Sequence, residues 1–256
     1  MKGPCLDLCV FYKENQIIKP LEFVLDFCNM WDTAGFDPFK LHKRRTLIPV
    51  AEITEDCFFG GRGLRKGLLL KSSLKRDHED VLFMFEIPRK KRITDPAYKR
   101  YEGPFSSIAI SIPFEKIRAN SNYTFDRLFQ IFLRLLSYGA VESATVSLGM
   151  SDFQWEVDEQ ISHFLKEKDA IIVKRRLQWA TFFTTYEHQK ILQGFANANS
   201  SLEAFCEQNG LEILMTDEFD GIILKVKEPI MEDTPDYFYA MLKRTQEFYS
   251  ILETNG

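Results

Sequence analysis

The sequence lacks the cysteine spacing of a disulfide scaffold or a zinc site. Its five cysteines are an odd number and include no Cys-x-x-Cys pair, a spacing that neither secreted scaffolds nor structural zinc sites favour. We therefore expect small, buried hydrophobic side chains with free thiols in a reducing compartment. They are Cys5, Cys9, Cys28, Cys57 and Cys206.

Long apolar runs are also missing. The N-terminal apolar stretch is short and is interrupted by Asp7, whereas a signal peptide needs an uninterrupted run of roughly 7–15 residues. Elsewhere, the charge-free runs fall well short of the roughly 18 residues that span a membrane. The chain is therefore expected to be cytoplasmic, without a membrane partner.

Histidine is scarce, and the sequence contains no familiar nucleophile or metal motif. The four histidines form no His-Glu-x-x-His pair, and no Gly-x-Ser-x-Gly elbow is present. The glycine-rich stretch 60–67 runs into a strand-like apolar segment instead of the helix N-terminus that a phosphate loop uses, so we predict a turn there. We expect no catalytic residue, no metal and no cofactor, and hence no enzyme; an enzyme of unrecognised type would need a pocket of convergent polar groups.

The charge is unevenly distributed along the chain. Residues 62–100 contain twelve Lys and Arg against five acids, and residues 201–256 contain twelve acids against four bases. The basic run 88–92, with Arg89, Lys90, Lys91 and Arg92, is interpreted as a solvated loop. Nucleic-acid binding through the 62–100 segment is the alternative function, because clustered basic residues form the electrostatic footprint of such proteins. Nucleic acid is not the expected partner.

The hydrophobic pattern predicts an α+β fold with a mixed, largely antiparallel sheet covered by helices. A chain of this length can bury about three quarters of its unfolded surface, which is enough for one large core. We expect a single α+β domain over 1–256, with 89–104 as the best candidate for a division into two lobes. Predicted strands are 6–13, 46–53 (at an edge, because of Pro49), 64–72, 81–87, 105–114, 142–149, 178–185 and a hairpin within 211–227; predicted helices are 19–31, 121–140, 154–167, 186–198, 200–210 and 234–252.

The acidic C-terminal part contains the predicted partner-binding residues. The segment 216–221 is an acidic turn ending in Asp-Gly, a hairpin signal, and a second acidic segment opens the last helix. Acids there also suit a helix N-terminus. The functional interpretation is an acidic surface with aromatic anchors that docks on a basic partner. Its residues are Asp217, Glu218, Phe219, Asp220, Glu232, Asp233, Asp236 and Tyr237.

The stretch 179–233 resembles a known family. It has Trp179-x-Thr181 at the head of a strand, a helix containing the sequence KILQG, and Gly221-Ile222-Ile223 in the second strand of a hairpin, followed by Pro229 and Asp233. This order resembles the bacterial immunity protein 52 family, which neighbours polymorphic and type VI secreted toxins. Trp179 itself is expected in the core.

The resemblance implies a non-enzymatic inhibitor that binds and neutralises a cognate toxin by occluding its active site. In that family the toxin is often a nuclease of the restriction-endonuclease fold. An acidic hairpin would suit the cationic DNA-binding cleft of such a toxin by imitating phosphate. The basic segment 62–100 is not explained by this picture.

Overall fold

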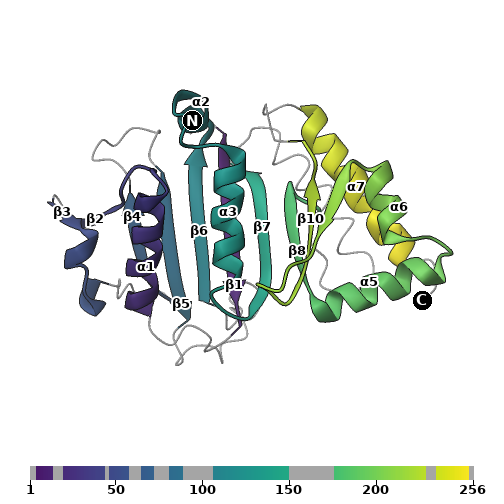
Figure 1. Cartoon of the computed structure of the whole chain (residues 1–256), viewed down its shortest axis with the longest axis horizontal. Helices are drawn as coiled ribbons and strands as arrows, with labels where there is room; N and C mark the ends of the chain where they lie inside the picture. The colour runs from purple at the N-terminus through teal and green to yellow at the C-terminus, as the bar shows by residue number, and fades with distance from the viewer. Residues whose placement is uncertain are drawn as a thin grey trace. The chain divides into compact units, whose positions relative to one another are not determined.

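We describe the fold from a computed structural model of the whole chain (Figure 1). The chain forms two compact units, one of residues 6–142 and the other of residues 143–256 together with 1–5. The residues that the structure describes are 4–13, 20–43, 46–57, 65–71, 81–88, 106–149, 176–228 and 235–253.

The unit of residues 6–142 is built on an antiparallel arrangement of strands. These strands are β1 (Cys5–Tyr12), β2 (Lys40–Lys43), β3 (Thr46–Pro49), β4 (Arg65–Lys71), β5 (Leu82–Pro88) and β6 (Ser106–Pro113). Their order is β3-β2-β4-β5-β6-β1, and the pairings from β3 through β6 are antiparallel. β3 lies at the end of the order, which confirms the edge position predicted from Pro49.

Helices cover one face of these strands. In β1 the side chains of Leu6, Leu8 and Val10 are buried and alternate with half-buried residues, which is the period of a strand with one face toward the core. The helices α1 (Pro20–Thr33) and α3 (Phe125–Leu136) lie on the same face (Figure 1). A short helix, α2 (Phe114–Ala119), precedes α3.

The core beneath α1 is rich in aromatic rings. Phe27 stacks on Phe83 of β5 with ring centroids 4.8 Å apart, and Trp31 lies 4.3 Å from Phe36. The Tyr12 hydroxyl of β1 donates a hydrogen bond to the Leu135 carbonyl of α3 at 2.6 Å. These contacts explain why so many of the phenylalanines of this sequence are needed inside.

The second unit has four strands and, among the described residues, three helices. Its strands are β7 (Val141–Gly149), β8 (Ala180–Thr184), β9 (Leu211–Leu214) and β10 (Gly221–Val226), in the order β7-β8-β10-β9. Each neighbouring pair is antiparallel. The helices are α5 (Thr185–Asn197), α6 (Leu202–Gln208) and α7 (Pro235–Glu253).

These strands and helices bury one hydrophobic cluster. The N-termini of α5 and α6 are capped by Thr184, which forms a capping box with Glu187, and by Ser201, whose Oγ accepts from the Ala204 amide at 3.1 Å. The cluster includes Leu177, Phe183, Ile191, Phe195, Leu202, Phe205, Cys206, Leu211, Ile222, Leu224, Phe248, Tyr249 and Leu252.

The predicted α+β class and the antiparallel pairing are confirmed. Two short elements, β2 and α2, were not predicted, and the strand expected over 46–53 ends at Pro49, where a 3₁₀ turn (Val50–Glu52) begins. The glycine-rich stretch is followed by strand β4, as expected, but its residues 58–64 lie outside the described residues. The helix predicted over 154–167 and the candidate boundary 89–104 also lie outside them.

The cysteines agree with the sequence-based expectation. All five thiols are free. Cys5, Cys28, Cys57 and Cys206 are buried, and Cys9 is half-buried.

Candidate partner-binding surface

The acidic turn predicted at 216–221 joins β9 to β10, as expected. Ile223 pairs with Leu214 across the hairpin, and β10 pairs with β8 on its other side. The first residue of β10, Gly221, approaches β8 closely, because a Cβ built on it would lie 2.2 Å from the Phe183 carbonyl oxygen. Only glycine fits there.

At the tip of the hairpin, three carboxylates face solvent. Asp217, Glu218 and Asp220 are exposed, whereas Phe219 between them is only 9% exposed. The Phe219 ring packs edge-on against Phe182 of β8, with centroids 5.9 Å apart. Phe219 therefore fixes the tip to the sheet. The prediction that its ring anchors a partner was wrong, because the ring is buried against Phe182. The acids are left on the outside.

The tip is also attached to the first turn of α5. The Thr185 hydroxyl donates a hydrogen bond to Asp220, and the Glu218 amide donates to the Thr216 hydroxyl at 3.1 Å. Next to Thr185, Tyr186 is 65% exposed. The turn is thus attached to α5 at Asp220, and a local hydrogen bond orders its first half.

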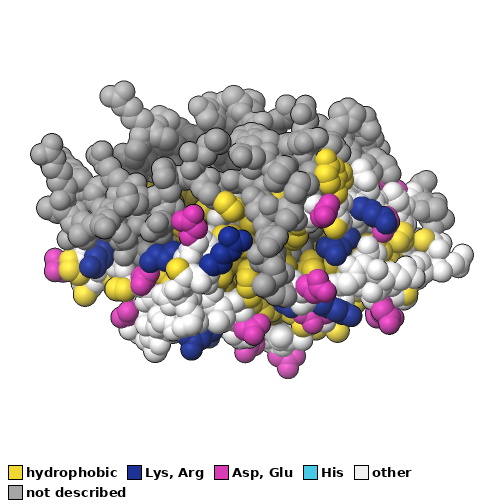
Figure 2. Space-filling model, turned by 90° about the horizontal axis from the view of Figure 1, so that it is seen from above, with side chains coloured by type: hydrophobic (Ala, Val, Ile, Leu, Met, Phe, Trp, Pro, Cys, Tyr) yellow, Lys and Arg dark blue, Asp and Glu magenta, His cyan; other side chains and the backbone are white. Residues whose placement is uncertain are grey.

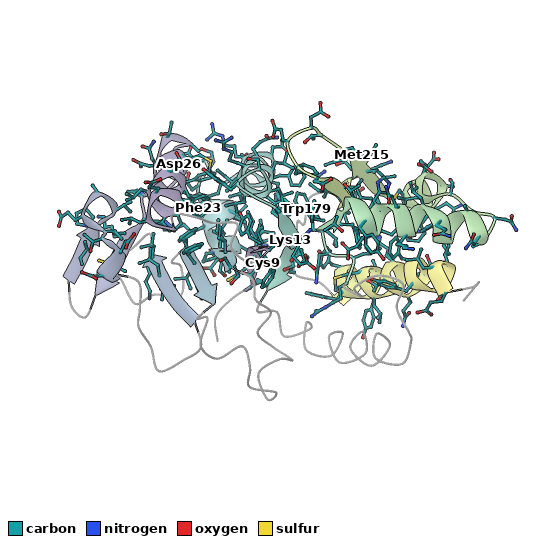
Figure 3. The ribbon with its side chains drawn as sticks, turned by 90° about the horizontal axis from the view of Figure 1, so that it is seen from below. Cys9, Lys13, Phe23, Asp26, Trp179 and Met215 are labelled. Carbon is teal, nitrogen blue, oxygen red and sulfur yellow. The ribbon has the colours of Figure 1, made fainter. Side chains whose placement is uncertain are left out.

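Two large apolar side chains accompany these acids. Met215, at the start of the turn, is 67% exposed (Figure 3), and the Tyr186 ring lies under the Lys190 ammonium at 5.7 Å. We call the set Met215, Asp217, Glu218, Asp220 and Tyr186 the tip surface. The sequence analysis missed both apolar members. Tyr186 could have been found, because it lies off the buried stripe of α5.

The remaining predicted residues are not brought into this surface by the described contacts. Asp236 is exposed in the first turn of α7. The Tyr237 hydroxyl is buried, and this burial raises its pKa; the ring lies 5.3 Å from that of Phe238. Tyr237 is therefore not an exposed anchor. Glu232 and Asp233 lie outside the described residues.

The Trp179-x-Thr181 pair is part of the framework of the second unit. Trp179 is buried, as predicted, and its Nε1 donates to the Glu228 carbonyl at 2.8 Å. The Lys225 ammonium lies 5.3 Å from its ring centroid. Thr181 is also buried, and its hydroxyl accepts from the Gln178 amide at 2.8 Å. These hydrogen bonds fix the backbone where β8 begins.

On the face that Figure 2 shows, acidic and basic side chains are interspersed over the described surface. They do not gather there into one large patch of a single sign.

The first unit has an apolar cleft between α1 and the Val50–Glu52 turn. Its volume is about 390 Å³, within the range of small-molecule sites. Burial raises the pKa of the Cys28 thiol to about 12, so this thiol is not a ready nucleophile. The cleft is lined by Leu25, Cys28, Asn29, Asp32, Pro38, Phe39, Lys40, Pro49, Val50 and Ala51.

Other candidate sites are limited by what the structure describes. Within the described residues, no group of three or more His, Cys, Asp or Glu side chains is placed to hold a metal ion. The basic residues Arg89, Lys90, Lys91 and Arg92 lie outside the described part of the chain. Of the helices that are described, none has the length and apolar character needed to cross a membrane.

Replacing Gly221 by alanine should destabilise the second unit. The added methyl would overlap the Phe183 carbonyl and lie 2.7 Å from the Phe182 ring, so the strand must shift, at a cost of about 2–3 kcal/mol in the free energy of unfolding. Urea denaturation followed by circular dichroism measures this. Gly210→Ala is the control: its backbone φ of +63° is unfavourable, but the space is open, so we expect only about 1 kcal/mol. Equal costs would contradict the close approach.

Comparison with known proteins found structural similarity but no match by sequence. No protein-family model matches the sequence, and no curated protein matches it. A solved structure of a T6SS protein from Pseudomonas aeruginosa is similar to this chain, with 14% sequence identity and a TM-score of 0.48. The match covers 96% of this chain and 73% of that one. A likeness at this level is not evidence of a shared function.

Proposed function

We propose that this chain is a non-enzymatic immunity protein that binds and neutralises a secreted bacterial toxin, in the context of type VI or polymorphic toxin systems. The tip surface forms part of the interface. The proposal draws on the order of motifs in 179–233 and on the hairpin that those motifs build.

The observation that carries this proposal is the construction of the tip. Asp217, Glu218 and Asp220 are exposed on a turn that the buried Phe219 ring and the Thr185–Asp220 hydrogen bond hold in place. Because the turn is already ordered, little conformational entropy would be lost when a partner binds it. Carboxylates fixed in this way attract a basic partner and orient it.

A nuclease is the toxin class that best matches this surface. Nucleases bind phosphates through basic clefts, and closely spaced carboxylates can occupy the same positions. Exposed Met215 and Tyr186 add apolar contact area beside the charges. Tyrosine is among the residues that supply much of the binding energy of interfaces, and methionine is enriched in them.

The experiment that tests the proposal uses the gene immediately upstream. This gene is expressed in a laboratory bacterium alone and together with the present chain. We expect the upstream gene to be toxic when it is expressed alone and growth to be restored when this chain is expressed with it. The two purified proteins should then form a stable complex. Toxicity that this chain does not relieve, or a harmless neighbour, would overturn the proposed immunity function.

Reversing the charge of Asp217, Glu218 and Asp220 together should weaken the complex by roughly 100-fold, because close charge pairs at an interface contribute a few kcal/mol. Calorimetry on the purified pair measures the affinity, and urea denaturation checks the fold. The matched control reverses three exposed acids of the first unit, Glu52, Glu55 and Asp56. This control changes the net charge equally, so equal weakening by both variants would show a general charge effect rather than a hairpin interface.

The alternative function, nucleic-acid binding through residues 62–100, rests on a segment most of which lies outside the described residues. A titration with short DNA and RNA at several salt concentrations separates the two functions. Tight binding that falls steeply with salt would favour the alternative. We expect no such binding.

A further inference from the structure

Strand β9 ends the strand order of the second unit, and β10 is its neighbour on one side. The direction of the β10 backbone groups shows which N–H and C=O groups of β9 form hydrogen bonds with β10. The Val226 amide donates to the Trp179 carbonyl at 2.7 Å, so Val226 points toward β8. Backbone groups of successive residues alternate in direction, and Lys225 therefore points toward its partner Glu212 on β9.

The same alternation identifies the groups on the outer side of β9. The Lys227 amide donates to the Gly210 carbonyl at 3.0 Å, which agrees with Gly210 and Glu212 pointing inward. Ile213 and Met215, at the odd positions, then direct their N–H and C=O groups outward. The structure gives these outward groups no hydrogen-bond partner among the described residues.

An unpaired strand edge is a template for another strand, and proteins commonly protect it with proline or with charged side chains. The edge strand of the first unit, β3, ends on Pro49, which has no N–H to offer. β9 has no proline, and the one charged side chain within it, Glu212, forms an ion pair with Lys225. Among the described residues, β10 is the one strand paired with β9, and the other edge of β9 leads directly into the exposed Met215.

The surroundings of this edge favour a basic strand. Asp217 and Glu218 follow its C-terminal end, and Glu203 and Glu207 of α6 are exposed before its N-terminal end. Against these four acids, Lys227 is the exposed base beside Gly210. An extended segment that carries Lys or Arg at alternate positions could pair with the backbone and place charges near both groups of acids.

A second copy of this chain fits the edge less well. Antiparallel pairing of two β9 strands about Ile213 would bring the acidic tip of each copy next to Glu207 of the other. Like charges brought together in this way oppose the association. The charge pattern therefore favours a different, basic chain.

We propose that the β9 edge binds an extended, basic segment of a partner protein as an added strand, through the outward backbone groups of Ile213 and Met215. This inference rests on the proposed function in so far as the partner is the toxin. It names the mode of binding and the chemistry of the segment that binds.

The mode of binding can be tested without the toxin. The probe is an eight-residue synthetic peptide that alternates valine and lysine, and its binding is followed by amide shifts in two-dimensional NMR. We expect saturable shifts at Ile213 and Met215 and slower hydrogen exchange of both amides. A peptide with glutamate in place of lysine, and one with N-methyl groups on alternate amides, should each bind at least about tenfold more weakly.

One pair of variants separates backbone pairing from side-chain contact. Met215→Pro removes an outward N–H that has no hydrogen-bond partner among the described residues. It should therefore weaken the binding of the lysine peptide about fivefold to tenfold while leaving the fold intact. Met215→Ala removes the side chain but keeps the N–H, and the affinity should change less than about threefold. An equal loss for both variants, or none for the proline variant, would overturn strand addition.

The outcomes for the edge and for the proposed function are distinguishable. If the peptide fails to bind, binds equally well with glutamate, or shifts amides elsewhere, the edge proposal is wrong even where the toxin is neutralised. If the toxin experiment fails but the lysine peptide binds at Ile213 and Met215, the edge proposal stands for another basic partner. Toxin binding that resists Met215→Pro would show that the toxin does not bind by adding a strand to this edge.

Discussion

Replacing Phe248 by alanine is expected to lower the free energy of unfolding of the second unit by about 3–5 kcal/mol. Phe248 of α7 is fully buried, and its ring centroid lies 5.8 Å from Phe183, 5.8 Å from Phe195 and 5.6 Å from Phe205. Truncation leaves a cavity between β8, α5, α6 and α7, and large-to-small changes of this kind cost about 3–5 kcal/mol. Urea denaturation followed by circular dichroism would measure the loss.

Tyr239 on the same helix provides the control. Its side chain is 47% exposed, so Tyr239→Ala should change the free energy of unfolding by about 0.5 kcal/mol or less. If Phe248→Ala cost no more than Tyr239→Ala, the four aromatic rings would not form the packed centre of this unit.

The Phe248 variant also bears on function. The same cluster contains Phe183, which is adjacent to Phe182 on β8, where the Phe219 ring rests. A folded domain has a free energy of unfolding of about 5–15 kcal/mol, so the loss of the contacts made by the Phe248 ring removes a large fraction of it. We expect Phe248→Ala to abolish the rescue of growth in bacteria that express the toxin, although no residue of the tip surface is changed.

Local sequence signals predicted most of the elements because those signals are themselves local. Ser201 and Gly210 define the ends of α6, and Asp220-Gly221 marks the hairpin, as the sequence indicated. Pro49 also predicted an edge strand correctly, because a residue without an N–H cannot pair on both sides. In contrast, β2 has only four residues and α2 only six, which is too short for a periodic pattern to stand out.

The candidate site was only partly predictable from sequence. Asp217, Glu218 and Asp220 lie together because they share one turn, and adjacency in the chain is enough to show that. The burial of Phe219 depends on Phe182, which is distant in sequence, and so could not be read from the turn. The outward direction of the Ile213 and Met215 amides depends likewise on the pairing of β9 with β10.

The buried carboxyl group of Asp7 in β1 should make the stability of the first unit depend on pH. Asp7 points to the side of the strand opposite to buried Leu6 and Leu8, and its Oδ1 is buried without a hydrogen-bond partner among the described residues. Burial raises its pKa from 3.8 to about 6, although the hydrogen bond with Ser111 opposes this change. The ionised form is thus less stable in the folded chain than in the unfolded one.

The direction of the pH dependence follows from this raised pKa. Well below the unfolded pKa of 3.8, Asp7 is protonated in both states and carries no penalty. As the pH rises from about 4 to about 6, the unfolded chain loses the proton first, and the folded state loses stability. Above the folded pKa of about 6 the penalty is complete, at about 3 kcal/mol for a difference of this size.

Asp7→Asn should therefore stabilise the first unit at pH 7.5, by about 1–3 kcal/mol, and change its stability little at pH 4. The amide keeps the shape of the carboxyl group but is never ionised, so the variant loses the penalty only where the native residue would be charged. Urea denaturation at both pH values measures the difference, with Asp56→Asn, an exposed acid of the same unit, as the control that should shift at neither. Destabilisation by Asp7→Asn at both pH values would mean instead that the Ser111 contact of the native carboxyl outweighs its desolvation.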